Sequence, residues 1–427
     1  MQRVGIGIFG FGVVGGGVID VLRRERELIA RRTGIDLELR AVVSLPPYRS
    51  SDVLGARLGE EPRLILEDPE IRIALLLVGG TTAARQLAHD CLRAGKHLVT
   101  SNKALIAEHG DELFAAARAA GVSIAFEAAV AGGIPIIGAL RDGLCANQIR
   151  SLTAILNGTT NYILTMMEQH GWSYEQALRE AQRLGYAEAD PTLDVRGIDT
   201  AHKLAILARI AFHIQVPLAA LRVEGIERVT AQDIASAARM RCRIKLLARA
   251  QVSGQDIDLH VAPTLVPLEH PLASVHMNYN GIYIESSNAG PQLYTGQGAG
   301  ALPTASAVLA DTVDVALGRS KQTFEAYGFV QNTTAWQCVG EREERTASYA
   351  RFRVIDRPGV LASIAQVLSR KGISIRSIYQ GEPQTGQADI ELLTYPARGG
   401  DFLDAINEID ESAVTTAPTV CYRCLLP

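Results

Sequence analysis

The sequence predicts an α/β protein of two or three units that begins with a parallel sheet. A β-branched run, a glycine-rich loop and an amphipathic stretch follow one another at the N-terminus, and short apolar runs then alternate with helical patterns. Such alternation indicates a parallel sheet covered by helices. A chain of 427 residues with 47% hydrophobic residues is also too long for one core, since single cores stop growing near ~250 to 300 residues.

Residues 1–147 are predicted to form a doubly wound parallel sheet of the Rossmann type. Val4 to Phe9 reads as a strand, Gly10 to Gly15 as a loop, and Val18 to Leu28 as the first helix. Further strands are expected at 37–43, 73–78 and 98–100, and further helices at 81–94 and 104–119.

The loop has the spacing G-x-G-x-x-G of a dinucleotide site. Gly10 allows a tight turn, Gly12 lets a pyrophosphate approach the backbone, and Gly15 lets the helix pack closely. We expect a dinucleotide there, because the loop lies between a predicted strand and a predicted helix; the alternative is a glycine-rich turn without a ligand. The intervening residues Phe11, Val13 and Val14 belong to the predicted cofactor site.

The end of the second strand bears on the choice between NAD and NADP. An acid there binds both ribose hydroxyls of NAD. Here the strand runs to Ser44, Leu45 and Pro46 and carries no acid, while Arg49 follows closely. A serine tolerates a 2′-phosphate and an arginine can contact it, so NADP is favoured over NAD.

Residues 148–299 are predicted to form a second α/β unit. Its most informative segment runs from Gly185 to Lys203 and holds Glu188, Asp190, Asp194 and Asp199 ahead of a helix that is apolar nearly all round. A helix of that kind is buried. Asp199 and Lys203 stand one turn apart on one face.

Lys203 is the best candidate for proton transfer. Oxidation of an alcohol by hydride transfer needs a group that accepts the hydroxyl proton, and no Tyr-x-x-x-Lys pair is present to do it. The alternative, an exposed Asp/Lys pair worth only ~0.3 to 0.5 kcal/mol, suits a more polar helix. His202 faces another direction and is expected to be a packed core residue.

The remaining segments complete the predicted organisation. Arg239, Arg241, Arg243 and Lys245 recur with period 2, which is typical of the solvated face of a strand. A linker is expected at 331–347. Residues 348–427 then read as strand, helix, strand, strand, helix, strand, the order of a ferredoxin-like module; the six elements are 349–355, 359–370, 373–380, 388–394, 401–409 and 419–425.

Together these motifs resemble the homoserine dehydrogenase family over nearly the whole chain. That family interconverts L-homoserine and L-aspartate 4-semialdehyde with NAD(P), in the biosynthesis of threonine, methionine and isoleucine. The motifs that carry the resemblance are Gly10–Gly15, Val99–Leu105, Glu127–Pro135, Asn157–Leu164, the acidic segment ending at Lys203, and Gly298–Thr304.

The resemblance implies roles for single residues. Lys203 is implied to be the proton donor, Glu188 and Asp199 to hold the substrate's amino group or hydroxyl, and Lys103 to be a second lysine near the nicotinamide; an ordinary loop cation is the alternative for Lys103. Substrate contacts are implied for Gly185, Glu188, Asp194, Asp199 and Lys203, and further cofactor contacts for Thr81, Thr100, Ser101, Lys103 and Gly300.

Two further features follow from the resemblance. The helix beginning near Pro303 is implied to return to the first domain, so that 300–330 completes it. A monovalent-cation loop, most of whose ligands are backbone carbonyls, is implied at Glu127, Val130, Gly132 and Ile134. Such carbonyls suit sodium rather than zinc.

The C-terminal module resembles an ACT domain, an amino-acid sensor. In this family such a tail implies feedback, with threonine as the first candidate effector, and side-by-side pairing into a homodimer or homotetramer. The alternative is a tail that only dimerises. No role is predicted for Cys421 and Cys424, which point to opposite faces of a strand. The implied effector residues are Asp356, Pro358, Gly359, Val360 and Leu361.

Composition excludes other classes of partner. With 42 Lys plus Arg against 46 Asp plus Glu, the net charge of -4 provides no field for nucleic acid or a membrane surface. No spanning segment or secretion signal is read, and six cysteines form no disulfide framework, so a cytoplasmic enzyme is expected. No kinase domain is expected ahead of residue 4.

Two rival functions stay open. A semialdehyde dehydrogenase acting through a thioester needs an activated cysteine, whereas Cys91 and Cys145 lie in apolar helical contexts without a partner histidine. A non-catalytic sensor would bind cofactor without hydride transfer.

Overall fold

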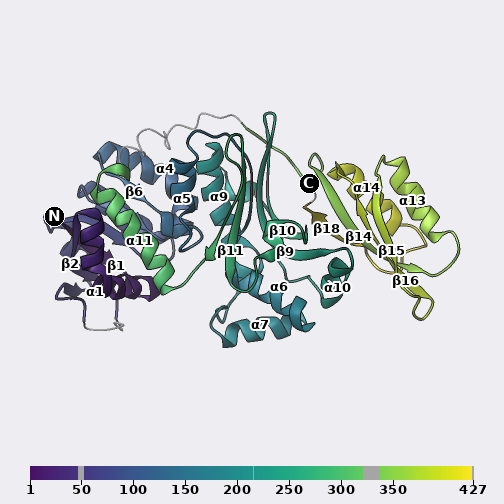
Figure 1. Cartoon of the computed structure of the whole chain (residues 1–427), viewed down its shortest axis with the longest axis horizontal. Helices are drawn as coiled ribbons and strands as arrows, with labels where there is room; N and C mark the ends of the chain where they lie inside the picture. The colour runs from purple at the N-terminus through teal and green to yellow at the C-terminus, as the bar shows by residue number, and fades with distance from the viewer. Residues whose placement is uncertain (47–51, 215, 321–335, 426–427) are drawn as a thin grey trace.

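The computed structural model describes residues 1–46, 52–214, 216–320 and 336–425. Two sheets organise the chain: a six-stranded sheet at the N-terminal end and a twelve-stranded sheet that continues to the C-terminus. Figure 1 shows the first sheet with its helices at one end, long strands in the middle and the C-terminal unit at the other end. The predicted α/β class, with a doubly wound sheet first, is confirmed.

The first sheet is entirely parallel, in the order β3-β2-β1-β4-β5-β6. The order reverses between β1 and β4, and ligands of such sheets bind beyond the carboxyl ends of the strands at this switch point. The loop 10–15 leaves β1 there. The strands are β1 (Gln2–Phe9), β2 (Ile35–Val43), β3 (Arg57–Gly59), β4 (Ile71–Leu76), β5 (His97–Thr100) and β6 (Ile124–Ala125).

Helices cover both faces of this sheet, and one of them comes from far along the chain. α11 (Ala301–Ala316) packs against α1 so closely that a Cβ on Gly17 would stand 2.5 Å from the carbonyl oxygen of Ala301. Residues 321–330 of the segment predicted to complete this domain lie outside the described residues. The other helices are α1 (Val13–Thr33), α2 (Arg63–Leu66), α3 (Thr82–Arg93) and α4 (Lys103–Ala120).

The second domain folds around long antiparallel strands. β9 and β10 pair over twelve residues each, and β7 joins β9 to β11. Short helical turns η1 (Glu127–Ala129), α5 (Ile136–Gly138) and η2 (Ala139–Gly143) lead into it from the first domain. Its strands are β7 (Ile149–Ile155), β8 (Arg222–Val223), β9 (Cys242–Ser253), β10 (Asp256–Pro267), β11 (Tyr279–Ser286) and β12 (Gly290–Gln297).

Helices cover one face of these strands. The most buried are α6 and α9; α9 is the apolar helix that the sequence predicts, whereas α6 was not predicted. The helical elements are α6 (Gly158–His170), α7 (Tyr174–Arg183), α8 (Thr192–Val195), α9 (Ile198–Phe212), η3 (Leu218–Ala220), α10 (Ala231–Arg239) and η4 (Pro271–Ser274).

The basic residues that recur with period 2 do not form a solvated strand face, so this prediction is wrong. Arg239 ends α10, Arg241 lies in a turn with φ +56°, and only Arg243 and Lys245 belong to β9. Lys245 is 1% exposed. Its Nζ donates to Asn161 Oδ1 (2.9 Å) and to the carbonyl of Val275 (2.7 Å), because α6 covers this face of the strand.

The C-terminal unit has the predicted order of strands and helices. It is not a separate sheet, however: β18 pairs in parallel with β10, joining Thr264 to Arg423 and Leu265 to Cys424. β14 already begins at Arg345, inside the predicted linker, and residues 331–335 of that linker lie outside the described residues. The elements are β13 (Gln337–Cys338), β14 (Arg345–Ile355), α13 (Val360–Arg370), β15 (Ile375–Gln380), β16 (Gln387–Thr394), β17 (Ala397–Arg398), α14 (Gly399–Asp410) and β18 (Val420–Cys424).

Over the described ranges, the structure contains no helix both long enough and apolar enough to traverse a lipid bilayer.

Candidate active site

The glycine loop has the geometry that its spacing predicts. Gly10 has φ +100°, where a side chain would be strained, and a Cβ on Gly15 would stand 2.1 Å from the carbonyl oxygen of Gly10. Gly12 faces open space. The turn is therefore tight on its inner side and open on the side where a ligand can approach the backbone.

Two helix N-termini belong to this open surface. Val13, the first residue of α1, is 62% exposed, and Gly300, at φ +125°, immediately precedes α11. Helix N-termini favour negative charge such as phosphate. The amide of Phe11 donates to Ser44 Oγ (3.2 Å), which ties the end of β2 to the loop.

The carboxyl ends of β4 and β5 are joined by side chains. Thr100 is fully buried and its hydroxyl donates to the carbonyl of Leu76 (2.8 Å), so its side chain is engaged within the protein. Asn102 donates to the carbonyls of Val78 (3.0 Å) and Gly80 (2.6 Å) and caps α4. Thr81 and Ser101, also predicted cofactor contacts, are both partly exposed beside it.

Lys103 and Lys203 meet at one carboxylate. Asp199 Oδ1 lies 2.5 Å from Lys103 Nζ, and Asp199 Oδ2 lies 2.8 Å from Lys203 Nζ. Lys203 Nζ also donates to the carbonyl of Leu156 (2.7 Å). Because α4 belongs to the first domain and α9 to the second, the centre lies at the boundary between them. The predicted role of Asp199 as a substrate holder differs from this arrangement, in which both its oxygens contact lysines.

Asn157 organises the acids, although it was not among the predicted site residues. Its Oδ1 caps α6, while its Nδ2 donates to Asp199 Oδ2 (2.9 Å) and Asp194 Oδ1 (2.7 Å). A sequence signal was present, since Asn-Gly-Thr-Thr after a strand is typical of a helix start. The bridge to two acids could not be read from that signal.

Burial and charge oppose each other in this centre. Burial alone raises the pKa of Asp199, but Lys203 and Lys103 outweigh it and hold that pKa well below its usual value. Burial lowers the pKa of Lys103, yet Asp199 raises it above normal. Burial raises the pKa of Asp194, against the hydrogen bond from Asn157. Asp199 is thus ionised, and Asp194 holds its proton more readily.

The other predicted substrate residues lie at the edge of this centre. Gly185 (φ +75°) and Glu188 are exposed between α7 and α8, and the charge of Glu188 acts on Lys103. Asp194 is partly buried on α8. An exposed acid whose charge reaches this centre can receive an ammonium group from solvent.

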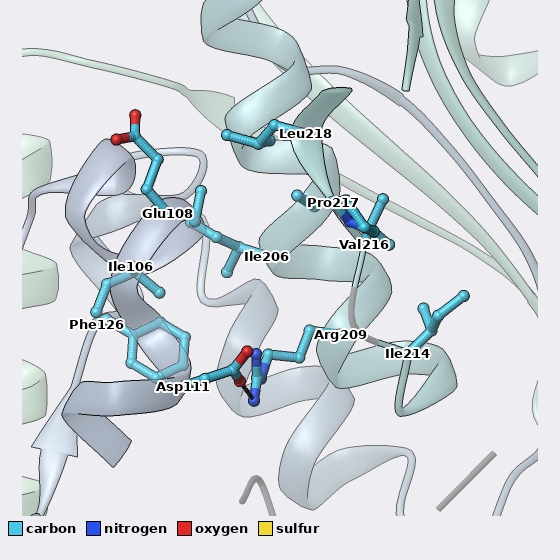
Figure 2. Close-up of a pocket in the computed structure, with 12 residues that line it drawn as sticks. Ile106, Glu108, Asp111, Phe126, Ile206, Arg209, Ile214, Val216, Pro217 and Leu218 are labelled. Atoms are coloured by element: carbon cyan, nitrogen blue, oxygen red, sulfur yellow. Dashed lines mark ion pairs between the residues drawn. The ribbon is translucent and has the colours of Figure 1, made fainter. Parts of the chain in front are cut away.

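Further contacts hold α4 and α9 together below the lysines. His202 Nε2 lies 3.8 Å from Glu108 Oε1, and Arg209 forms an ion pair with Asp111. Figure 2 shows Arg209 and Asp111 beside a largely apolar cavity of about 370 Å³ between the two helices. Neither Lys103 nor Lys203 lines this cavity. The cavity therefore belongs to the contact between α4 and α9 and not to the reacting centre.

The predicted cation loop packs against the segment before α11. Gly132 has φ +55°, and a Cβ there would stand 2.6 Å from the backbone of Gly298. The carboxylate of Glu127 accepts the amides of Ile137 and Gly138, both at 2.8 Å. Burial raises the pKa of Glu127. Its carboxylate is thus already engaged with the backbone.

The predicted effector loop is accessible. Gly359 has φ +92° and precedes α13, Asp356 is exposed, and Leu361 is partly exposed, while the Val360 side chain packs in the core. Cys421 and Cys424 lie on opposite faces of β18, as predicted, since they pack in different cores. All six cysteines are free thiols.

An open dinucleotide loop beside a buried lysine–carboxylate centre defines the class of a nicotinamide-dependent oxidoreductase. Family models match three segments: residues 10–127 match the homoserine dehydrogenase NAD binding domain, 135–313 homoserine dehydrogenase, and 348–413 the ACT domain. Homoserine dehydrogenase from Pseudomonas aeruginosa is 41% identical over 429 residues, which cover 99% of each chain.

Solved structures agree. A homoserine dehydrogenase from Thiobacillus denitrificans matches with a TM-score of 0.90 and 41% identity, covering 99% of this chain and 98% of that one. A hyperthermophilic archaeal homoserine dehydrogenase mutant in complex with NADPH matches with a TM-score of 0.62 and 28% identity, over 74% and 98% of the chains. The chain belongs to the homoserine dehydrogenase family, and its reaction is the interconversion of L-homoserine and L-aspartate 4-semialdehyde.

Proposed function

We propose that Lys203 carries the proton in this reaction, with NADP as the preferred cofactor. The observation that supports Lys203 is its position: of its three N–H groups, two are directed at Asp199 and Leu156, and the third has no acceptor within the described part of the chain. A buried ammonium held in this way has one donor left for a substrate oxygen.

Each residue of the site has its own proposed role in the reduction of the semialdehyde. A bound nicotinamide supplies the hydride that reaches the carbonyl carbon of the semialdehyde. Lys203 gives a proton to the carbonyl oxygen, which becomes the hydroxyl of homoserine, and the same lysine takes that proton back in the oxidative direction. Asp199 holds Lys203 and Lys103 in place, and Lys103 adds positive charge beside the oxygen. Glu188 receives the substrate ammonium, and a carboxyl oxygen of Asp194 accepts a hydrogen bond from it.

The test is a kinetic assay of the whole chain. NADPH oxidation on addition of L-aspartate 4-semialdehyde is expected for the wild-type protein, and Lys203→Ala should lower kcat by ~100-fold or more with NADPH binding retained. Lys245→Met is the matched control, because Lys245 is also buried but lies on β9: it should lower stability and leave kcat per folded molecule unchanged. Comparable turnover in Lys203→Ala refutes the proposed role.

NADP preference is supported by the end of β2. Ser44, rather than an acid, lies against the glycine loop, and Arg49 lies outside the described residues. Ser44→Asp should lower kcat/KM for NADPH by ~10-fold or more while sparing NADH, because a carboxylate repels the 2′-phosphate and binds ribose hydroxyls. Ser44→Ala is the control. A wild-type protein that uses NADH better than NADPH contradicts the proposal.

We also propose a monovalent cation at Glu127, Val130, Gly132 and Ile134. The residues fit a hard cation, since three would offer backbone carbonyls and a carboxylate oxygen keeps a second lone pair when it accepts an amide. Rates in sodium, potassium and choline chloride at equal ionic strength test it: equal stability and rate in all three argue against a bound ion.

Feedback by an amino acid and self-association are proposed for the C-terminal unit. The loop 356–361 supports the first, since amides at the start of α13 can meet a carboxylate. β15, a strand at the edge of the large sheet with exposed Ile378 and Tyr379, supports the second. Rates titrated with L-threonine, and the mass in solution of wild type and Ile378→Lys, test the two separately.

A further inference from the structure

Asn280 is a fully buried asparagine beside the lysine–carboxylate centre, and neither the sequence motifs nor the proposed mechanism uses it. It is the second residue of β11. Its Nδ2 donates to the carbonyl of Leu156 (3.0 Å). The Nζ of Lys203 donates to the same carbonyl (2.7 Å). One backbone oxygen therefore accepts hydrogen bonds from both a neutral amide and the ammonium group that we propose carries the proton.

The carbonyl of Leu156 belongs to no regular element. Leu156 lies between the end of β7 and Asn157, which is the N-cap of α6. A carbonyl oxygen has two lone pairs, and here the donors of Lys203 and Asn280 can take one each. Because an amide is neutral, Asn280 holds this carbonyl in place without adding a like charge beside Lys203. The direction of the carbonyl is thus set by a side chain and not by a strand or helix.

Gly298 makes room for the amide of Asn280. A Cβ at position 298 would stand 2.1 Å from both Cγ and Nδ2 of Asn280 and 2.4 Å from its Oδ1. The planar amide therefore packs directly on the backbone of Gly298, where a residue with a side chain would displace it. The same backbone is crowded by Gly132, on which a Cβ would stand 2.6 Å from the Gly298 carbonyl oxygen. Asn280 is thus confined against the segment that leads to Gly300 and α11.

The burial of Asn280 carries a cost that packing alone does not explain. Its Oδ1 is buried and has no hydrogen-bond partner in the part of the chain that the structure describes. A buried polar atom without a partner destabilises a fold, and such atoms are rare. An apolar side chain would avoid this cost. The use of an amide at this position therefore lies in the donor that its Nδ2 provides to Leu156.

We infer that Asn280 is a positioning residue for Lys203. Asn280 fixes the carbonyl of Leu156, and this carbonyl and Asp199 each hold one N–H group of Lys203. The third N–H group is then directed at the substrate oxygen. This inference rests on the proposed role of Lys203 in proton transfer. Loss of the amide should lower kcat, because a misdirected donor slows the transfer, and it should leave the affinity for NADPH unchanged.

The experiment is a double-mutant cycle between Asn280 and Lys203 in the whole chain, assayed with NADPH and L-aspartate 4-semialdehyde. Asn280→Ala should lower kcat per folded molecule by ~10-fold, with NADPH affinity unchanged in a fluorescence titration. In the Lys203→Ala background, the same substitution should change the residual kcat by less than ~2-fold, because the group that Asn280 positions is absent.

Thr264→Ala is the matched control for loss of a buried polar group. Thr264 is 3% exposed on β10, and its hydroxyl donates to the carbonyl of Ala262 (3.1 Å). Its removal should lower the free energy of unfolding and leave kcat per folded molecule unchanged. A merely structural role for Asn280 predicts that Asn280→Ala behaves in the same way as this control.

Gly298→Ala provides a second cycle with the same amide. Its Cβ displaces the Asn280 side chain, so Gly298→Ala alone should also lower kcat by ~10-fold. When residue 280 is alanine the Cβ has room, and the double variant should be no slower than either single variant. Asn280→Asp has the size and planarity of asparagine but no donor. It should lower kcat at least as much as Asn280→Ala, and it serves if an alanine variant fails to fold.

The outcomes separate this inference from the role of Lys203. Wild-type kcat per folded molecule in Asn280→Ala overturns the inference alone. An equal loss from Asn280→Ala in the wild-type and Lys203→Ala backgrounds, or losses that multiply when Gly298→Ala and Asn280→Ala are combined, also overturns it. Full turnover in Lys203→Ala by itself refutes the role of Lys203, and this inference with it.

Discussion

The two boundaries between domains both bury charge, but they use different cations. At the first boundary, Lys103 and Lys203 share Asp199. At the second, Arg222 and Arg423 share Glu344, with distances of 3.0 and 3.3 Å to its Oε2. An ammonium can release its proton when its surroundings change, whereas a guanidinium stays charged at every physiological pH. The first boundary is suited to proton transfer and the second to holding domains together.

Three side chains at the second boundary have the spacing of metal ligands. Ligand atoms of Asp258, His260 and Glu344 lie within 4.8 Å of one another. Arg222 nevertheless donates to both Asp258 and Glu344. Burial raises the pKa of Asp258, but His260 and Arg222 hold it below its usual value. The carboxylates are thus neutralised by guanidinium groups, which leaves a cation no charge to bind.

Asp199→Asn is the substitution with the largest expected effect, and it acts on the first boundary. Without the carboxylate, the buried Lys203 ammonium loses the group that orients it, and Lys103 loses the charge that raises its pKa. We expect kcat to fall by ~100-fold or more and the pH at which the rate is halved on the alkaline side to shift downward. Steady-state rates across pH measure both. Glu188→Gln, on the exposed rim, should raise KM for the semialdehyde and shift the pH profile much less than Asp199→Asn does, because Asp199 has the larger influence on Lys103; an unshifted profile in Asp199→Asn would contradict the positioning role.

The difference between the two boundaries also explains which of their residues could be predicted from the sequence. Asp199 and Lys203 are one helical turn apart, and the glycine loop is contiguous, so local spacing revealed both. Lys103 was found only through resemblance, because its contact with Asp199 spans distant segments.

The second boundary could not be predicted in this way. Each of its residues comes from a different element: Arg222 from β8, Asp258 from β10, Glu344 from the turn before β14 and Arg423 from β18. The prediction for Lys245 was wrong for a related reason. Period 2 tells which residues share a strand face, but not that α6 covers that face.

Glu344→Gln tests the second boundary. Removing its charge leaves Arg222 with Asp258 alone and Arg423 with Glu341 alone, and the loss of two charged hydrogen bonds should cost about 1.5 to 3 kcal/mol of unfolding free energy. Urea unfolding measures the loss, and kcat per folded molecule should not change. The neighbouring Glu343, 57% exposed and 3.9 Å from Arg398, provides the control: Glu343→Gln should change stability by less than ~0.5 kcal/mol. Equal effects of the two substitutions would refute a structural role for the buried cluster.

The pH dependence of stability provides a further test of the first boundary. The folded-state pKa of Asp199 is lowered, so its contribution is present above the ordinary value of 3.8 and is lost as pH falls through the folded value. The pKa of Lys103 is raised from 10.5, so its contribution is present below that value and is lost as pH rises through the folded one. Urea unfolding of wild type and Asp199→Asn should therefore differ most near neutral pH and converge in acid. A constant difference down to pH ~2 would contradict the shifted pKa of Asp199.

The smallest expected effect comes from an arginine outside both boundaries. Arg370 pairs with Glu408 between α13 and α14, with side chains 53% and 43% exposed. Solvent screens such a pair, so Arg370→Ala should change the unfolding free energy by only about 0 to 1 kcal/mol. Arg423→Ala removes the same chemical group from a position where its side chain is only 15% exposed and takes a partner from both Glu344 and Glu341, so it should cost several times more. If the two substitutions proved equivalent by urea unfolding, burial would not be what distinguishes the second boundary, and its stabilising role would have to rest on packing of β18 against β10 alone.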